Sequence, residues 1–131
     1  MTDKNVSIMN IGSMGYLPQV FKKIENEKKL NIVYLGGSIT MGCNATKTEL
    51  RYVDRSAKWW QTNFPDAEIS YFNAGIGATT SQFGVARVQE HVLDKQPDLV
   101  FVEFSVNDSS SPLFMETYES LVRRLRKAES V

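Results

Sequence analysis

Apolar residues along the chain follow two kinds of spacing, and the two kinds alternate. Spacing of three and four residues predicts helices over residues 17–29, 53–64 and 81–94, and a last helix with Ser111 as N-cap and Pro112 at its first position. Short β-rich runs predict three strands, in the segments NIVYL (31–35), EISYF (68–72) and DLVFVEF (98–104).

This alternation predicts the fold class. Strands that alternate with helices form right-handed βαβ units, and such units build a parallel sheet that helices cover on both faces. We therefore expect an α/β fold. Because no repeat, low-complexity segment or linker interrupts the pattern, we expect one domain over residues 16–131, preceded by an N-terminal extension over residues 1–15.

The composition and charge of the chain argue against several classes of function. The chain has 131 residues, 42% of them hydrophobic, and its 15 basic residues balance 15 acidic ones without a long run of either sign. We therefore expect no nucleic-acid and no membrane partner. The single cysteine, Cys43, and the lack of metal-ligand spacing predict neither a metal nor another cofactor. Since residues 1–15 do not have the pattern of a signal peptide, we expect a cytoplasmic protein.

Three loops follow the three predicted strands, and in an open α/β sheet such loops meet at one edge. They are GGSITMG (36–42), NAGIGATT (73–80) and SVNDSSSP (105–112). Each loop alone allows two interpretations. Ser38 is either a nucleophile or a helix cap. The turns at Gly75 and Gly77 either present N–H groups to an oxyanion or are simple turns. Asn107 either donates its side-chain amide to the same oxyanion or forms an Asx turn. Together they hold what an ester hydrolase needs, a serine at a strand exit and converging N–H donors.

The segments IVYLGGSITMG, NAGIGATTSQFG and DLVFVEFSVND resemble, in order and spacing, the first three sequence blocks of the GDSL, or SGNH, hydrolase family. The resemblance covers roughly residues 30–126. It implies a flavodoxin-like three-layer α/β/α fold, a Ser-His-Asp mechanism and a small-molecule ester substrate, with acetylated carbohydrate as one candidate.

The resemblance also implies roles for individual residues. Ser38 matches the nucleophile, and its backbone N–H, the backbone N–H of Ala78 and the side-chain amide of Asn107 match the oxyanion hole. Three positions depart from the family pattern: Gly37 replaces an aspartate, Ala78 replaces the second-block glycine, and Ser105 replaces the glycine that begins the third block.

The family's general base is missing from this sequence. The family carries its histidine in a late D-x-x-H block, whereas the only histidine here, His91, belongs to a predicted helix that runs away from the loop edge. We therefore expect a partial hydrolase domain of about three strands, inactive alone. A truncated chain, a short paralogue that only binds, and a base supplied by a partner remain open.

Two further expectations follow. If the chain ends here, the apolar third strand is an open edge, which predicts self-association through that edge. The alternative function is a non-catalytic ligand-binding or nucleotide-binding α/β domain, because Gly75, Gly77 and Thr80 imitate part of a dinucleotide-binding fingerprint.

Overall fold

The computed structural model describes residues 12, 13 and 15–128. Most of the predicted N-terminal extension therefore lies outside the described residues, and its boundary at residue 16 stays a prediction. Along the described chain the elements are α1 (Leu17–Glu27), β1 (Lys29–Gly36), α2 (Ser38–Met41), η2 (Thr48–Leu50), α3 (Tyr52–Asn63), β2 (Glu68–Gly75), α4 (Ser81–His91), η3 (Leu93–Lys95), β3 (Leu99–Glu103), α5 (Ser105–Asp108) and α6 (Phe114–Ala128).

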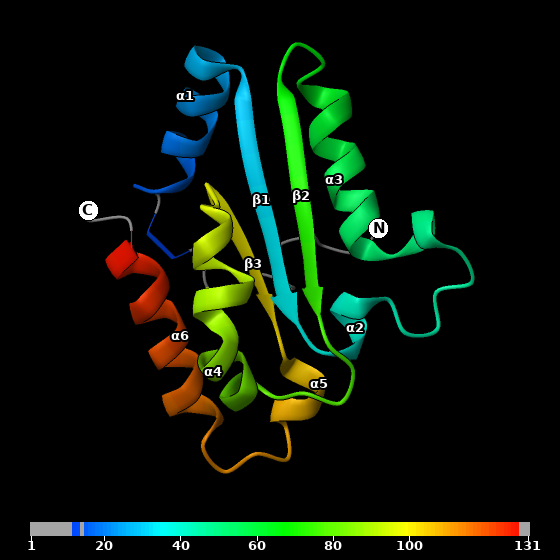
Figure 1. The fold of residues 1–131 in the computed structure, drawn as a ribbon, viewed down its shortest axis with the longest axis vertical. Helices are drawn as coiled ribbons and strands as arrows, with labels where there is room; N and C mark the ends of the chain where they lie inside the picture. The colour runs from blue at the N-terminus through cyan, green and yellow to red at the C-terminus, as the bar shows by residue number, and fades with distance from the viewer. Residues whose placement is uncertain (1–11, 14, 129–131) are drawn as a thin grey trace, which may run out of the picture.

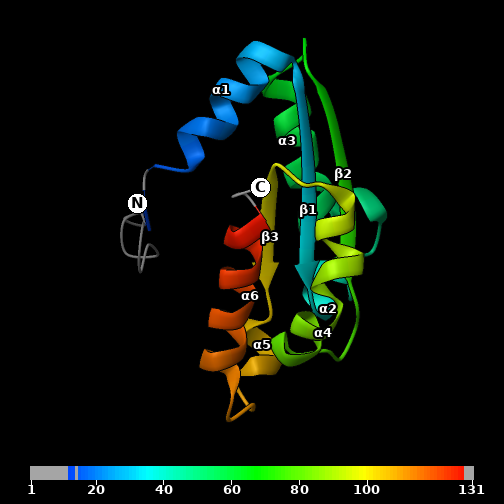
Figure 2. The same cartoon turned by 60° about the vertical axis from the view of Figure 1, so that its left-hand side comes forward.

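The three strands form one parallel sheet in the order β2-β1-β3, which confirms the predicted α/β class. In Figure 1 the strands run side by side and their arrowheads point to the same end of the molecule, where α2 and α5 lie. Figure 2 shows that the start of α4 reaches that end too. The loops that follow the strands therefore meet at one edge, as the sequence predicted.

The central strand β1 carries the core on both of its faces. Val33 and Leu35 pack in a cluster with residues of α4 and α6, whereas Ile32 and Tyr34 pack in a second cluster with residues of α1 and α3. All four side chains are fully buried. A parallel strand covered on both faces is apolar at consecutive positions, and this explains the continuous run in the sequence. The result is the three-layer arrangement that the family resemblance implied.

The last helix corrects one prediction. Ser111 and Pro112 do not start α6, which begins at Phe114. The Ser111 N–H donates to the carbonyl of Asp108 at 2.9 Å, so Ser111 belongs to the turn that ends α5.

The helix predicted over residues 81–94 is three residues longer than α4 in the structure. The backbone leaves the α-helix after His91 and forms the short 3₁₀ helix η3.

Within the described residues, no helix is long and apolar enough to cross a membrane. Trp60 is buried in the core, whereas Trp59 is exposed on the same helix.

Candidate active site

Ser38 is the first residue of α2, directly after the turn that ends β1. The Gly37 N–H donates to the carbonyl of Glu103 at 3.1 Å, so β3 holds the turn in place. Ser38 is half-buried. Neither its backbone N–H nor its hydroxyl has a hydrogen-bond partner among the residues that the structure describes. Both groups are therefore available to a ligand.

Two glycines let α2 sit directly on the strand ends. A Cβ atom at Gly36 would overlap the Thr40 side chain and come within 2.5 Å of the Glu103 carbonyl. A Cβ atom at Gly75 would overlap the backbone of Met41. These positions need glycine because backbone approaches backbone, and larger residues would push Ser38 away from the sheet edge.

The short helix α2 is tied to its surroundings by Thr40. The buried Thr40 hydroxyl and the Tyr52 hydroxyl lie 2.9 Å apart, and the Asn73 side-chain amide donates to the Thr40 carbonyl at 2.8 Å. Burial raises the pKa of Tyr52, so this hydroxyl stays protonated at neutral pH. An α-helix of four residues has almost no stability of its own, so these contacts with α3 and β2 fix the position of Ser38.

The segment after α2 is held by Arg51. Its side chain packs against Gly42, where a Cβ atom would overlap it, and its Nε donates to Asp54 Oδ2 at 2.6 Å. Burial alone raises the pKa of Asp54, but hydrogen bonds from Arg51 and Tyr71 and the Arg51 charge outweigh it, so the pKa lies below its ordinary value of 3.8. Asp54 is therefore ionised at neutral pH.

Ala78 lies in the second loop with a left-handed backbone, at φ +57°. This conformation explains why a glycine is expected here in the family, and Ala78 adopts it in spite of its Cβ atom. The Ala78 backbone N–H has no hydrogen-bond partner within the described part of the chain. The side chain is exposed. The next residue, Thr79, turns its carbonyl toward the third loop.

Asn107 joins the three loops. Its Nδ2 donates to the Thr79 carbonyl at 2.7 Å, and a Cβ atom placed on Gly37 would lie 3.2 Å from both of these atoms. Ser38 and Asn107 line one small hollow, together with Gly37, Ile39, Glu103, Phe104 and Val106. Ala78 does not line this hollow, although its neighbour Thr79 touches Asn107. The structure thus brings Ser38 and Asn107 together and places Ala78 beside them.

Two carboxylates support the third loop. Glu103 Oε1 accepts hydrogen bonds from the Ser105 N–H at 2.9 Å and from the Ser105 hydroxyl at 2.5 Å. Asp108 is 3% exposed, and its Oδ1 accepts a hydrogen bond from the Ser81 N–H at 2.8 Å, at the start of α4. The sequence analysis missed this contact, because the pattern of apolar residues gives no sign that the third loop reaches α4.

His91 takes no part in this arrangement. Its Nδ1 lies 3.1 Å from Arg87 Nη1 and accepts a hydrogen bond from it, since a guanidinium only donates. His91 is the last residue of α4 and does not line the hollow around Ser38. Across residues 12, 13 and 15–128, no group of three or more His, Cys, Asp or Glu side chains is arranged to hold a metal ion.

Comparison with known proteins gives the family of the chain. The sequence profile of the GDSL-like lipase/acylhydrolase family matches residues 34–130. The chain belongs to this family. No curated protein sequence matches it.

Among solved structures, the chain is similar to a two-domain esterase active on acetylated mannans, with 52% identity and a TM-score of 0.74 over 80% of this chain and 29% of that one. A lipase/acylhydrolase from Enterococcus faecalis is 27% identical, with a TM-score of 0.61 over 72% of this chain and 51% of that one. An acetyl-xylooligosaccharide esterase from Geobacillus shares the fold, at 23% identity and a TM-score of 0.63 over 76% and 55% of the two chains. The chain thus spans less than a third of the first relative and about half of the others.

Proposed function

We propose that this chain provides the nucleophile and the oxyanion donors of a serine esterase that removes small acyl groups, acetyl above all, from carbohydrate. Ser38 is the nucleophile. The observation that carries this proposal is the convergence at one hollow of an unbonded Ser38 hydroxyl, the unbonded Ser38 N–H and the Asn107 amide.

The chemistry follows from these groups. Ser38 Oγ attacks the ester carbonyl carbon and loses its proton to a base, and the carbonyl oxygen becomes an oxyanion. The N–H groups of Ser38, Ala78 and Asn107 donate to this oxygen, where each donor is worth roughly 3 kcal/mol in the transition state. When the carbonyl re-forms, the ester C–O bond breaks and the alcohol leaves with a proton. Water then hydrolyses the acyl-Ser38 ester.

The base must come from outside the hollow. The sequence contains one histidine, His91, and it contacts Arg87. We expect the base to be the histidine of the family's D-x-x-H block, which these residues do not contain.

The side chains that line the hollow favour a small apolar acyl group. The apolar side chains of Ile39 and Val106 line it and are largely exposed, so they suit the methyl of an acetyl group better than a charged acyl chain. The 52% identical relative is described as active on acetylated mannans, which makes acetylated mannan the first substrate to test.

The nucleotide-binding alternative has less support. A phosphate bound by a glycine-rich loop uses the free N–H groups at the start of the following helix. Here the N–H of Ser81, the first residue of α4, already donates to the carboxylate of Asp108. A negative group therefore occupies the place that a phosphate would take.

The test is covalent labelling of Ser38. The chain is incubated with a fluorophosphonate, with imidazole as an external base, and the mass of the intact protein is followed over time. We expect one phosphonyl adduct in the wild type and none in Ser38→Ala. Ser70→Ala is the matched control, because Ser70 is an exposed serine toward the other end of the sheet.

Labelling of Ser38→Ala at the wild-type rate, or no adduct in the wild type at any imidazole concentration, would contradict the nucleophile role. Release of acetate from acetylated manno-oligosaccharides under the same conditions tests the substrate. Equal release from Ser38→Ala and wild type would remove the substrate assignment.

A further inference from the structure

Arg87 is a buried cation that the esterase chemistry above does not use. It lies on α4, is 6% exposed, and has no carboxylate partner among the described residues. Its Nε has no hydrogen-bond partner either. Burial lowers the pKa of Arg87 from its usual value. Burying a charge without a counter-ion costs free energy, which the other contacts of the group must offset.

The guanidinium of Arg87 bridges the carboxyl ends of two strands. Its Nη1 donates to the Ala74 carbonyl at 2.6 Å, and its Nη2 donates to the Gly36 carbonyl at 3.0 Å. The Gly36 carbonyl also accepts the Ile76 N–H at 3.1 Å. Gly36 is the last residue of β1, and Ala74 is the next to last residue of β2. The bridge thus lies where the loops bearing Ser38 and Ala78 leave the sheet.

The plane of the guanidinium is itself fixed. His91 Nδ1 accepts a hydrogen bond from Nη1 at 3.1 Å, and the guanidinium carbon lies 5.8 Å from the centre of the Phe83 ring. Both residues belong to α4, one turn to either side of Arg87. A planar, pre-oriented fork donates to two separate carbonyls at once, which the single nitrogen of a lysine does less well.

We propose that Arg87 is a positioning residue for the oxyanion site, setting the spacing between the backbone N–H groups of Ser38 and Ala78 by holding the Gly36 and Ala74 carbonyls. The proposal rests on the esterase function proposed above. Spacing matters because oxyanion donors stabilise charge only when they already lie in place, and a misplacement of about 1 Å costs roughly 100-fold in rate.

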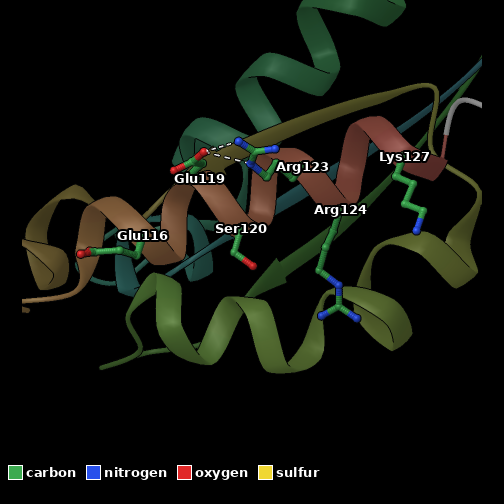
Figure 3. A pocket seen from close by; sticks show the side chains of 6 residues that line it. All are labelled: Glu116, Glu119, Ser120, Arg123, Arg124 and Lys127. Atoms are coloured by element: carbon green, nitrogen blue, oxygen red, sulfur yellow. Dashed lines mark hydrogen bonds and ion pairs between the residues drawn. The ribbon is translucent and has the colours of Figure 1, made fainter.

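The test compares Arg87→Met and Arg87→Lys with Arg124→Met. Arg124 is a matched control because its Nη1 also donates to a backbone carbonyl, that of Val85, at 2.8 Å. Its contact joins α6 to α4 at an exposed position (Figure 3).

The first measurement is amide hydrogen exchange, read at the Ile76 N–H and, as a reference for global unfolding, at the Val33 N–H in the middle of β1. In Arg87→Met we expect exchange at Ile76 to accelerate more than at Val33, and in Arg124→Met we expect no such difference. The second measurement is the rate of Ser38 phosphonylation with imidazole. We expect it to fall roughly 10- to 100-fold in Arg87→Met, less in Arg87→Lys, and not in Arg124→Met.

The two measurements separate the two proposals. If Ile76 exchange and Ser38 labelling change no more in either Arg87 variant than in Arg124→Met, the positioning role is wrong and the esterase function stands. If Ile76 exchange accelerates but wild-type Ser38 is never labelled, the bridge is structural and the proposed function fails. If Arg87→Met does not fold, Arg87→Lys decides: labelling at the wild-type rate overturns the positioning role.

Discussion

Replacing Asn107 with alanine separates a catalytic donor from a simple turn residue, because the two roles predict different magnitudes. In the structure the half-buried Asn107 amide makes one hydrogen bond to protein, to the Thr79 carbonyl at 2.7 Å. Its second N–H has no partner among the described residues, and Asn107 lines the hollow beside Ser38. The variant removes both N–H groups without introducing a charge.

The effect of this variant on stability is small. One hydrogen bond between neutral groups contributes about 1 kcal/mol to the free energy of unfolding. The unfolding entropy of a 131-residue chain is roughly 0.28 kcal/mol per kelvin, so the expected fall in Tm is about 4 °C. The effect on reaction is larger, because losing one oxyanion donor costs about 3–4 kcal/mol, or roughly 100- to 1,000-fold in rate.

The assay is the imidazole-dependent phosphonylation of Ser38, run beside a thermal melt. The control is Asn63→Ala, since the Asn63 amide likewise donates to a backbone carbonyl, that of Trp59, at 2.8 Å, but on exposed helix surface. We expect a comparable small fall in Tm for both variants and a loss of labelling only in Asn107→Ala. A labelling rate within a few-fold of wild type would mean that Asn107 only shapes its turn, and the assignment would be wrong.

Four further predictions follow from other parts of the molecule. Ala78→Gly relieves the strain of a left-handed alanine and should raise the free energy of unfolding by about 0.5–1 kcal/mol in urea titrations; a decrease would contradict the strain. Leu121→Ala empties a fully buried site and should lower the free energy of unfolding by about 3–5 kcal/mol, whereas a loss below about 1 kcal/mol would mean that the core closes over the cavity. Because the pKa of Asp54 lies below its ordinary value, its bond with Arg51 stabilises the fold above pH 3.8, and this stabilisation is lost as pH falls through the lowered pKa. Asp54→Asn should therefore reduce the loss of unfolding free energy between neutral and acidic pH, and an unchanged loss would refute the linkage. The outer edge of β3 has no strand partner among the described residues, so we expect self-association that sedimentation velocity detects as concentration rises, and a monomer at every concentration would contradict it.

The order of the helices and strands could be predicted from the sequence because each buried face requires apolar residues at a regular spacing. The continuous apolar run of β1 reflects burial on both sides, and the helical spacing of Val53, Ala57 and Trp60 marks the buried face of α3. Both patterns result from burial, and they can be read from the spacing of apolar residues in the sequence. The same patterns placed the ends of the strands correctly enough to bring Ser38 and Asn107 to one edge.

The short elements around the site could not be predicted in this way. The helices α2 and α5 have four residues each, which is too few for a helical period to appear. The start of α6 was predicted at Pro112 from local capping preference, but the turn closed by the Ser111 N–H and the Asp108 carbonyl takes precedence. Arg87 was missed because a lone arginine in a helix is usually solvated, and its two strand-end acceptors become neighbours only in the folded chain.

The contacts that order the candidate site all lie within residues 36–108, and none of them involves a base. Gly37 is held by Glu103, Thr79 by Asn107, and the ends of β1 and β2 by Arg87. Binding a transition state costs less free energy when the hydrogen-bond donors of the site are already ordered. The nucleophile and its oxyanion donors can therefore be in place before any base approaches Ser38, so adding a base, from imidazole or from another polypeptide segment, should raise the labelling rate of Ser38 without changing amide exchange at Ile76.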